Sequence, residues 1–418
     1  MEDAGRARAA DEPPIDGPMC GSAASDLIAP CPRPGPIPDR PDRPIVGPPL
    51  AVTFSGGGFR ATLTSIGVGR FLAAAGLLGN VRYLSSVSGG SVANGLLALA
   101  WDGLAKAEFS REAYDEAVVA PLTELVTRRS LSSALIRNVW RILGPSTRTD
   151  LLARFFDEWF FDGRELEELP SDVRWVFNAA NVTTGVRFGF ERDVVGDYVL
   201  GLVTTAGTGL RVAQAAAASA AVPGAFAPFK IDLAFPCANG REAKLLDGGT
   251  YDNLGLEVVD DRPDVFLVAV NAGGIFRTGR YRGIPIVRDL VRSSSLLYRQ
   301  TISLRHRDMV ERFQAWERAT RAGRAPPDWA RRGVLFGLAT TFDDRLSEEW
   351  AAHSPQPSRR EIERLACVPT SFGRFEPELC RALIRRGWWL AGASIATYHT
   401  DLLDTLPLWT EIASLEGA

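Results

Sequence analysis

Lysine, histidine and cysteine are all scarce in this chain of 418 residues. Arginine supplies almost all of the positive charge, because only Lys106, Lys230 and Lys244 are lysines, and the formal net charge is −3. A chain so close to neutrality has no overall field that would attract nucleic acid or anionic lipid. We therefore expect no nucleic-acid partner, while a hydrophobic content of 46% is ample for a large core.

Cysteine usage argues against two kinds of site. The five cysteines are odd in number and scattered, with no Cys-x-x-Cys pair: Cys20, Cys31, Cys237, Cys367 and Cys380. This pattern disfavours both a disulfide framework and a zinc site. No acidic loop of the calcium-binding kind is evident either. We expect neither a metal ion nor any other cofactor.

Long apolar runs are missing as well. The charged start of the chain has no apolar segment of the kind found in secretory signals. No stretch reaches the roughly 18 uninterrupted apolar residues that a membrane span needs. Arg70 interrupts the run 61–79, and Pro223 and Pro228 interrupt the run 211–229. We expect a soluble, cytoplasmic protein that associates with a membrane, if at all, only at its surface.

Residues 1–48 are rich in Pro, Gly, Asp and Arg without a hydrophobic period, which predicts a disordered segment. From residue 49 strand-like and helix-like segments alternate, which predicts an α/β fold with a mainly parallel sheet. Strand-like runs occupy 50–54, 81–88, 174–190 (two strands and a turn), 243–249, 265–274 and 334–338, and helical patterns occupy 60–79, 91–101, 103–172 and 286–322. We expect one domain over 49–405 and a tail over 406–418.

Three of the predicted strand ends carry unusual residues, and chemistry collects at the carboxyl ends of parallel strands. The first end is SGGGFRA (55–61). Consecutive glycines Gly56, Gly57 and Gly58 let backbone N–H groups point into one concavity at a helix start, which suits a phosphate or an oxyanion. Arg60 adds a positive charge there. The motif fits neither the dinucleotide G-x-G-x-x-G pattern nor the Walker pattern, and the alternative is a tight turn that binds nothing.

The second strand end is SVSGG (86–90), a near match to the nucleophile elbow G-x-S-x-G. In an elbow, Ser88 stands on a strained turn at a helix start, and small neighbours are needed because strand and helix approach closely. Ser86, in the place of the first elbow glycine, and Gly90 are small enough. The alternative is that Ser88 or Ser91 only caps the following helix.

The third strand end is LLDGG (245–249). Asp247 follows an apolar run and precedes two glycines. A carboxylate held there can accept the proton of a nearby serine and act as a general base. The alternative is a common Asp-Gly turn.

The order of these motifs resembles the patatin-like phospholipase family, and SGGGFRA also looks like the glycine loop of the cytosolic A2-type phospholipases, which share its catalytic core. Three further stretches resemble family segments, namely 155–190, AQAAAASAAVPGAFAPF (213–229) and 365–395, so that the likeness spans 49–400. It implies a three-layer α/β/α fold. It also implies a lipid or acyl-ester substrate, so the activity expected is that of a phospholipase A, lysophospholipase or lipid acyl hydrolase.

The resemblance also implies roles for individual residues. Ser88 would be the nucleophile and Asp247 its partner in a dyad that needs no histidine. The glycines at 56–58 would supply the oxyanion hole, and Arg60 would hold the loop or a substrate phosphate. Ser86 stands where the family usually has the first elbow glycine, which leaves the substrate class more open than the mechanism.

Two other functions fit the same motifs. An α/β-hydrolase triad would use Ser88, Asp247 and one of the late histidines, His306, His353 or His399, in the chain order typical of that fold. A non-enzymatic module would use the glycine loop to bind a phosphate or a lipid headgroup. Measuring whether hydrolysis depends on Ser88 or on a histidine distinguishes the patatin-like hydrolase, the α/β-hydrolase triad and the binding module. The sequence leaves the ester, the positional preference and the oligomeric state open.

Overall fold

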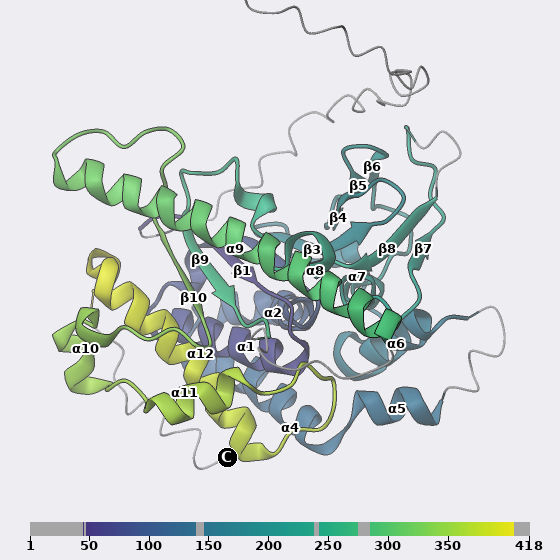
Figure 1. Ribbon diagram of the computed structural model, residues 1–418, viewed down its shortest axis with the longest axis horizontal. Helices are drawn as coiled ribbons and strands as arrows, with labels where there is room; N and C mark the ends of the chain where they lie inside the picture. Colours follow the sequence, from purple (N-terminus) through teal and green to yellow (C-terminus); the bar gives the residue numbers. More distant parts are fainter. Residues whose placement is uncertain (1–44, 46, 139–145, 238–241, 275–284, 405–418) are drawn as a thin grey trace, which may run out of the picture.

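A ten-stranded mixed sheet forms the centre of the computed structural model (Figure 1). The structure describes residues 45, 47–138, 146–237, 242–274 and 285–404. Most of the segment predicted to be disordered, 1–48, and the whole predicted tail, 406–418, lie outside the described residues.

The strand order is β10-β9-β1-β2-β3-β4-β5-β6, and β8 pairs with both β3 and β7. The strands are β1 (Leu50–Phe54), β2 (Val81–Val87), β3 (Arg174–Asn181), β4 (Val186–Phe190), β5 (Val194–Asp197), β6 (Gly201–Thr204), β7 (Phe229–Ile231), β8 (Ala243–Asp247), β9 (Phe266–Asn271) and β10 (Gly333–Gly337). The run from β10 to β3 is parallel throughout, and β4 to β8 add antiparallel pairs. The predicted α/β class and parallel core are confirmed.

One strand runs in a direction that the sequence did not predict. The motif LLDGG was expected at the carboxyl end of another parallel strand, but β8 is antiparallel to β3. Strand β4 occupies one edge of β3, so β2 and β8 share the other, with Val87 opposite Asn178 and Asp247 opposite Ala179. Strands β2 and β8 therefore approach each other head-on, and their carboxyl ends meet.

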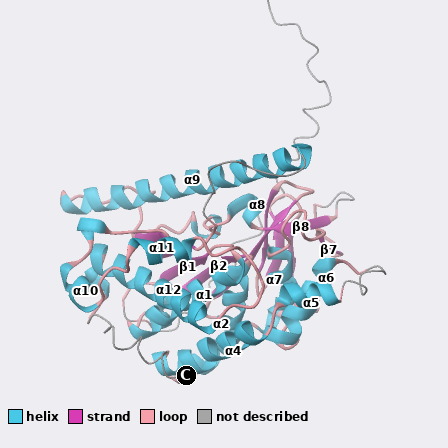
Figure 2. Cartoon of the chain, turned by 60° about the horizontal axis from the view of Figure 1, so that its bottom comes forward, coloured by secondary structure: helices cyan, strands magenta, loops and turns pink. Residues whose placement is uncertain are grey.

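Helices cover both faces of the sheet, which makes the three layers (Figure 2). Helices α1 (Gly58–Ala74), α2 (Gly89–Lys106), α7 (Val212–Ser219) and α12 (Pro377–Tyr398) lie on one face, and α9 (Pro285–Arg321) crosses the other. The remaining helices are α3 (Arg111–Tyr114), α4 (Ala120–Arg128), α5 (Leu131–Arg137), α6 (Arg148–Phe156), α8 (Gly249–Asp252), α10 (Glu348–His353) and α11 (Arg359–Ala366). No helix within the described residues is both long and apolar enough to cross a membrane.

Side-chain alternation along the strands builds two cores. In β1, Leu50, Val52 and Phe54 join the large core on the α1 side, whereas Ala51 joins the smaller core beneath α9. Every residue of β1 is buried, as expected for a strand covered on both faces.

The two central helices of the large core touch backbone to backbone. A Cβ on Gly67 of α1 would lie 2.0 Å from the carbonyl oxygen of Ile384, and a Cβ on Gly387 of α12 would lie 2.0 Å from that of Thr64. Glycine at both positions permits this close crossing, because any side chain would push the helices apart. The C-terminal helix thereby braces α1, which begins at the glycine loop.

The cysteine pattern did not predict a single disulfide bond that the structure contains. Cys237 is disulfide-bonded, whereas Cys367 and Cys380 are free. Spacing along the chain says nothing about contacts between distant segments, so an isolated pair escapes a search for regular cysteine patterns.

Candidate active site

Ser88 lies between β2 and α2 in a backbone conformation that serine rarely adopts. Its φ is 52° and its ψ is −120°. Such a conformation costs a non-glycine residue about 1–3 kcal/mol and persists only where the surrounding structure imposes it. The hydroxyl makes no capping hydrogen bond to α2, so the simple helix-cap alternative does not account for it.

The elbow fits only because its neighbours lack side chains. A Cβ on Gly89 would lie 2.1 Å from the carbonyl oxygen of Gly58, and one on Gly90 would lie 2.5 Å from that of Phe54. The start of α2 is thus in contact with both β1 and the glycine loop. Thr62 strengthens this contact, because its hydroxyl donates to the carbonyl oxygen of Gly89 at 2.7 Å.

A buried network of hydroxyl groups holds the elbow from below. Ser219, the last residue of α7, accepts a hydrogen bond from the Ser88 N–H at 2.9 Å and donates to the Asn178 carbonyl at 2.6 Å. Its hydroxyl also lies 2.9 Å from that of Ser91. Ser86 Oγ lies 3.1 Å from Ser91 Oγ and donates to a carbonyl of β3 at 3.1 Å. The serine in the first elbow position therefore belongs to the support of the turn.

Asp247 faces Ser88 across the meeting point of β2 and β8. The Ser88 hydroxyl lies close enough to the Asp247 carboxylate to lower its pKa, and the Gly249 N–H donates to Oδ1 of Asp247 at 2.7 Å. The two side chains are nearly covered, with relative exposures of 4% for Ser88 and 7% for Asp247. Burial raises the pKa of Asp247 to about 6, although the hydrogen bonds from Gly249 and Ser88 pull it back towards its usual range.

The glycine loop lies against this pair with two free donors. A Cβ on Gly56 would lie 3.2 Å from Ser88 Cβ. The Gly56 N–H itself donates to the Asn253 carbonyl at 3.2 Å, so it is not available to a ligand. The N–H groups of Gly57 and Gly58 have no acceptor among the described residues. Their φ values of 150° and 61° require glycine.

Arg60 is buried and holds two loops. Its Nε donates to the Ala272 carbonyl at 3.0 Å, and its Nη atoms donate to the Val368 carbonyl and, at 3.2 Å, to the Thr370 hydroxyl. Burial lowers its pKa. Of the two roles expected for Arg60, these contacts favour the holding of loops, because protein acceptors occupy all three nitrogens.

Asn253 and Tyr298 complete the surroundings of the pair. Oδ1 of Asn253 lies 2.4 Å from where Gly56 would carry a Cβ, while its buried Nδ2 has no partner among the described residues. Tyr298 descends from α9, and burial and the charge of Asp247 raise its pKa. Asn253 Nδ2 and the Tyr298 hydroxyl both lie beside Gly273, at 3.0 and 3.4 Å from its hypothetical Cβ. No sequence motif marks Tyr298.

Two of the three histidines contact backbone carbonyl groups elsewhere. His399 Nε2 lies 3.2 Å from a carbonyl oxygen of β10, and His353 Nδ1 lies 3.0 Å from a carbonyl oxygen of its own helix, α10. His306 belongs to α9, where burial lowers its pKa. In the part of the chain that the structure describes, no histidine hydrogen-bonds Ser88 or Asp247. A histidine-based triad has no support in this geometry.

The sequence model of the patatin-like phospholipase family matches residues 52–260, which is half of the chain. The chain belongs to the patatin-like phospholipase family. The matched range contains the glycine loop, Ser88 and Asp247. No curated protein matches the chain at a significant level.

Several solved structures resemble this patatin-like chain. Human GIVD cytosolic phospholipase A2 is 14% identical to this chain, with a TM-score of 0.49. The match covers 85% of this chain and 60% of the human chain. Its complex with methyl gamma-linolenyl fluorophosphonate and terbium chloride is 15% identical with a TM-score of 0.48, covering 86% and 61%. VipD from Legionella pneumophila is 12% identical with a TM-score of 0.37, covering 84% and 67%. The chain thus spans about three fifths of the human protein.

Proposed function

We propose that this patatin-like protein is a serine acyl hydrolase that cleaves carboxylic esters of lipids with a Ser88–Asp247 dyad. The observation that carries the proposal is the position of Ser88, which is held in a strained elbow next to a buried aspartate. Beside them lie two backbone N–H groups that have no acceptor among the described residues. A nucleophile, a base and an oxyanion site are the three groups that acyl transfer needs.

The first half of the reaction forms an acyl-enzyme. Asp247 takes the proton from Ser88 as Oγ attacks the ester carbonyl carbon. Negative charge develops on the carbonyl oxygen, and the N–H groups of Gly57 and Gly58, together with the N-terminus of α2, stabilise it. The tetrahedral intermediate collapses, the alcohol leaves, and Asp247 returns the proton to it.

The second half releases the acid. Water enters in place of the alcohol, and Asp247 removes its proton as the water oxygen attacks the acyl carbon. The same two glycine donors stabilise the second oxyanion, and the proton returns to Ser88 Oγ as the acid leaves. A base whose pKa is about 6 is well matched to this exchange near neutral pH.

Hydrolysis of a chain-length series of chromogenic acyl esters, and of a labelled phospholipid, tests the proposal. We expect turnover by the wild-type protein on at least one lipid-like ester, with dependence on acyl length. A folded protein that hydrolyses none of them would contradict the proposal and favour a module that only binds phosphate or a headgroup.

The pH dependence of kcat/KM should report the base. Asp247 must be ionised to accept the proton, so we expect kcat/KM to fall about tenfold per pH unit below pH 6 and to level off above it. The measurement is kcat/KM from pH 4 to pH 8, with the folded fraction checked at each pH by circular dichroism. A profile that titrates near 4, or one that changes when a histidine is replaced, would contradict the assignment.

Gly58→Ala should impair both folding and turnover. The new Cβ would lie 2.5 Å from the Ser371 carbonyl oxygen, at a φ of 61°, so the loop that carries one free donor has to shift. We expect kcat/KM to fall about 10²-fold, as on loss of one oxyanion donor. Gly76→Ala is the matched control, since Gly76 has a φ of 66° but open space around it. It should cost about 1 kcal/mol of stability and leave kcat/KM unchanged; equal activities would argue against the donor role of Gly58.

A further inference from the structure

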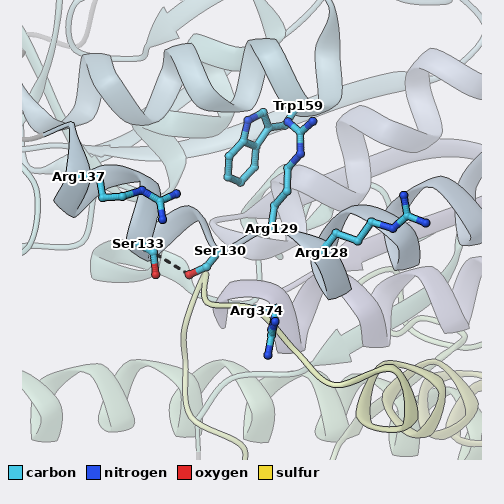
Figure 3. A pocket seen from close by; sticks show the side chains of 7 residues that line it. All are labelled: Arg128, Arg129, Ser130, Ser133, Arg137, Trp159 and Arg374. Carbon is cyan, nitrogen blue, oxygen red and sulfur yellow. Dashed lines mark hydrogen bonds between the residues drawn. The ribbon is translucent and has the colours of Figure 1, made fainter.

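An open cavity of about 560 Å³ lies outside the proposed active site, lined by α4, α5, the π-helix at Asp157–Phe161 and the loop before α12. Four arginines from these segments line it, namely Arg128, Arg129, Arg137 and Arg374, together with Trp159 (Figure 3). None of its described lining residues is acidic. We refer to it as the arginine pocket.

The positive charge in the arginine pocket is poorly neutralised. Arg128 and Arg374 each pair with a solvent-exposed glutamate from their own segment, at 2.7 and 3.6 Å, and exposed pairs of this kind contribute little. Arg129 lies over the Trp159 ring at 5.4 Å. Neither Arg129 nor Arg137 has a carboxylate partner among the described residues. Several arginines that line one cavity favour the binding of an anion there.

We propose that the arginine pocket binds a phosphate group and is a second ligand site of the protein. Guanidinium groups match phosphate oxygens through paired N–H donors, which is why arginine is favoured for this ligand. Such a phosphate could belong to a lipid headgroup or to a soluble ion. Trp159, half-buried at the pocket, and Ile136, which is 74% exposed beside Arg137, are side chains that suit a membrane surface.

The pocket is joined to the glycine loop through one short segment. The Phe372 carbonyl accepts the N–H groups of Leu131 and Ser132 at 3.0 and 3.2 Å, where α5 begins. The Phe372 ring packs edge-on against Phe59 at 5.1 Å, and the neighbouring Ser371 carbonyl accepts the Phe59 N–H at 2.9 Å. Phe59 directly follows Gly58. A phosphate bound by Arg374 would therefore be linked to the proposed oxyanion site through the short segment 371–374.

Vesicle co-sedimentation of the full chain tests this proposal, and the readout needs no catalysis. Vesicles of phosphatidylcholine alone are compared with vesicles that also contain phosphatidylglycerol. The double variant Arg129→Gln/Arg137→Gln removes the two arginines without carboxylate partners. Arg318→Gln/Arg324→Gln is the matched control, since it removes two exposed arginines near the far end of α9, at the opposite corner of Figure 1 from α5. Circular dichroism and thermal unfolding verify that each variant is folded.

We expect the pocket variant to bind anionic vesicles about tenfold to thirtyfold more weakly than the wild type, and the control to bind as the wild type does. Calorimetric titration with inorganic phosphate distinguishes the sources. If the wild type binds inorganic phosphate and the pocket variant does not, the ligand is a soluble ion. If phosphate does not displace the protein from anionic vesicles, the ligand is a lipid headgroup. Either result supports the site. Equal binding by the wild type and the pocket variant, or an equal loss in the control, would overturn it.

Discussion

Replacing Ser88 by alanine is expected to lower kcat/KM for every ester substrate by at least about 10⁴-fold, as removal of a nucleophile does in other acyl-transfer enzymes. The substitution removes the proposed nucleophile, and it leaves the N–H groups of Gly57 and Gly58 in place. Steady-state hydrolysis with a sensitive chromogenic ester measures it. Ser91→Ala is a suitable control, because Ser91 lies in the same buried hydroxyl network but has no hydrogen bond to Asp247 among the described residues.

The backbone of Ser88 makes a second prediction about the same residue. Glycine tolerates a φ of 52° without strain, whereas alanine does not. Ser88→Gly should therefore raise the free energy of unfolding relative to Ser88→Ala by about 1–3 kcal/mol, although we expect neither variant to hydrolyse esters. Urea denaturation of the two variants measures the difference. If Ser88→Gly is no more stable than Ser88→Ala, the elbow is not strained.

Replacing Asp247 by asparagine is expected to lower kcat/KM by about 10⁴-fold, comparable to the loss on disabling the carboxylate of a serine protease triad. Asparagine can still accept the N–H of Gly249, but it cannot take the proton of Ser88. A variant that replaces His306, His353 and His399 by glutamine should keep its activity, because none of these side chains hydrogen-bonds Ser88 or Asp247 among the described residues. If the folded histidine-free protein is dead and Asp247→Asn is active, the protein uses a histidine base.

Asp247→Asn should also make the protein more stable at neutral pH. Folding raises the pKa of Asp247 from 3.8 to about 6, so the buried carboxyl favours the folded state fully only below pH 4. That contribution is lost as the pH rises through 6 and the buried group becomes charged. Asp247→Asn removes the charge, so we expect it to raise the unfolding free energy by about 1–3 kcal/mol at pH 8 and by almost nothing at pH 4. Equal unfolding free energies of the wild type and Asp247→Asn at pH 8 would show that burial of the Asp247 carboxylate does not destabilise the folded protein.

The residues of the candidate site that the sequence predicted are those that stand in a distinctive local pattern. Few structures need an apolar strand that is followed by three glycines, or by a serine between small residues. These local patterns therefore identified positions 56–58 and Ser88 as candidate site residues. The parallel core and the pair of strands over 174–190 followed from hydrophobic runs bounded by turn residues. In each case the signal lies within a few residues of the feature that it predicts.

The rest of the site depends on contacts between distant segments. The direction of β8 is decided by the shared edge of β3, which no local pattern reports, yet that direction brings Asp247 to Ser88. Ser219 supports the elbow from 131 residues away, and Tyr298 arrives from the middle of a long helix. The Gly56 N–H donates to the carbonyl of Asn253, so among the described residues only Gly57 and Gly58 of the three glycines keep an N–H without an acceptor.

Covalent labelling with a fluorophosphonate probe is the most direct test of the central claim, because it identifies the nucleophile without knowledge of the natural ester. Labelled protein is digested, and the modified peptide is located by mass spectrometry. The Ser88–Asp247 dyad predicts one label on Ser88, none in Ser88→Ala, a much slower reaction in Asp247→Asn and an unchanged rate in the histidine-free variant. A label on another residue, or labelling that needs a histidine but not Asp247, would contradict it.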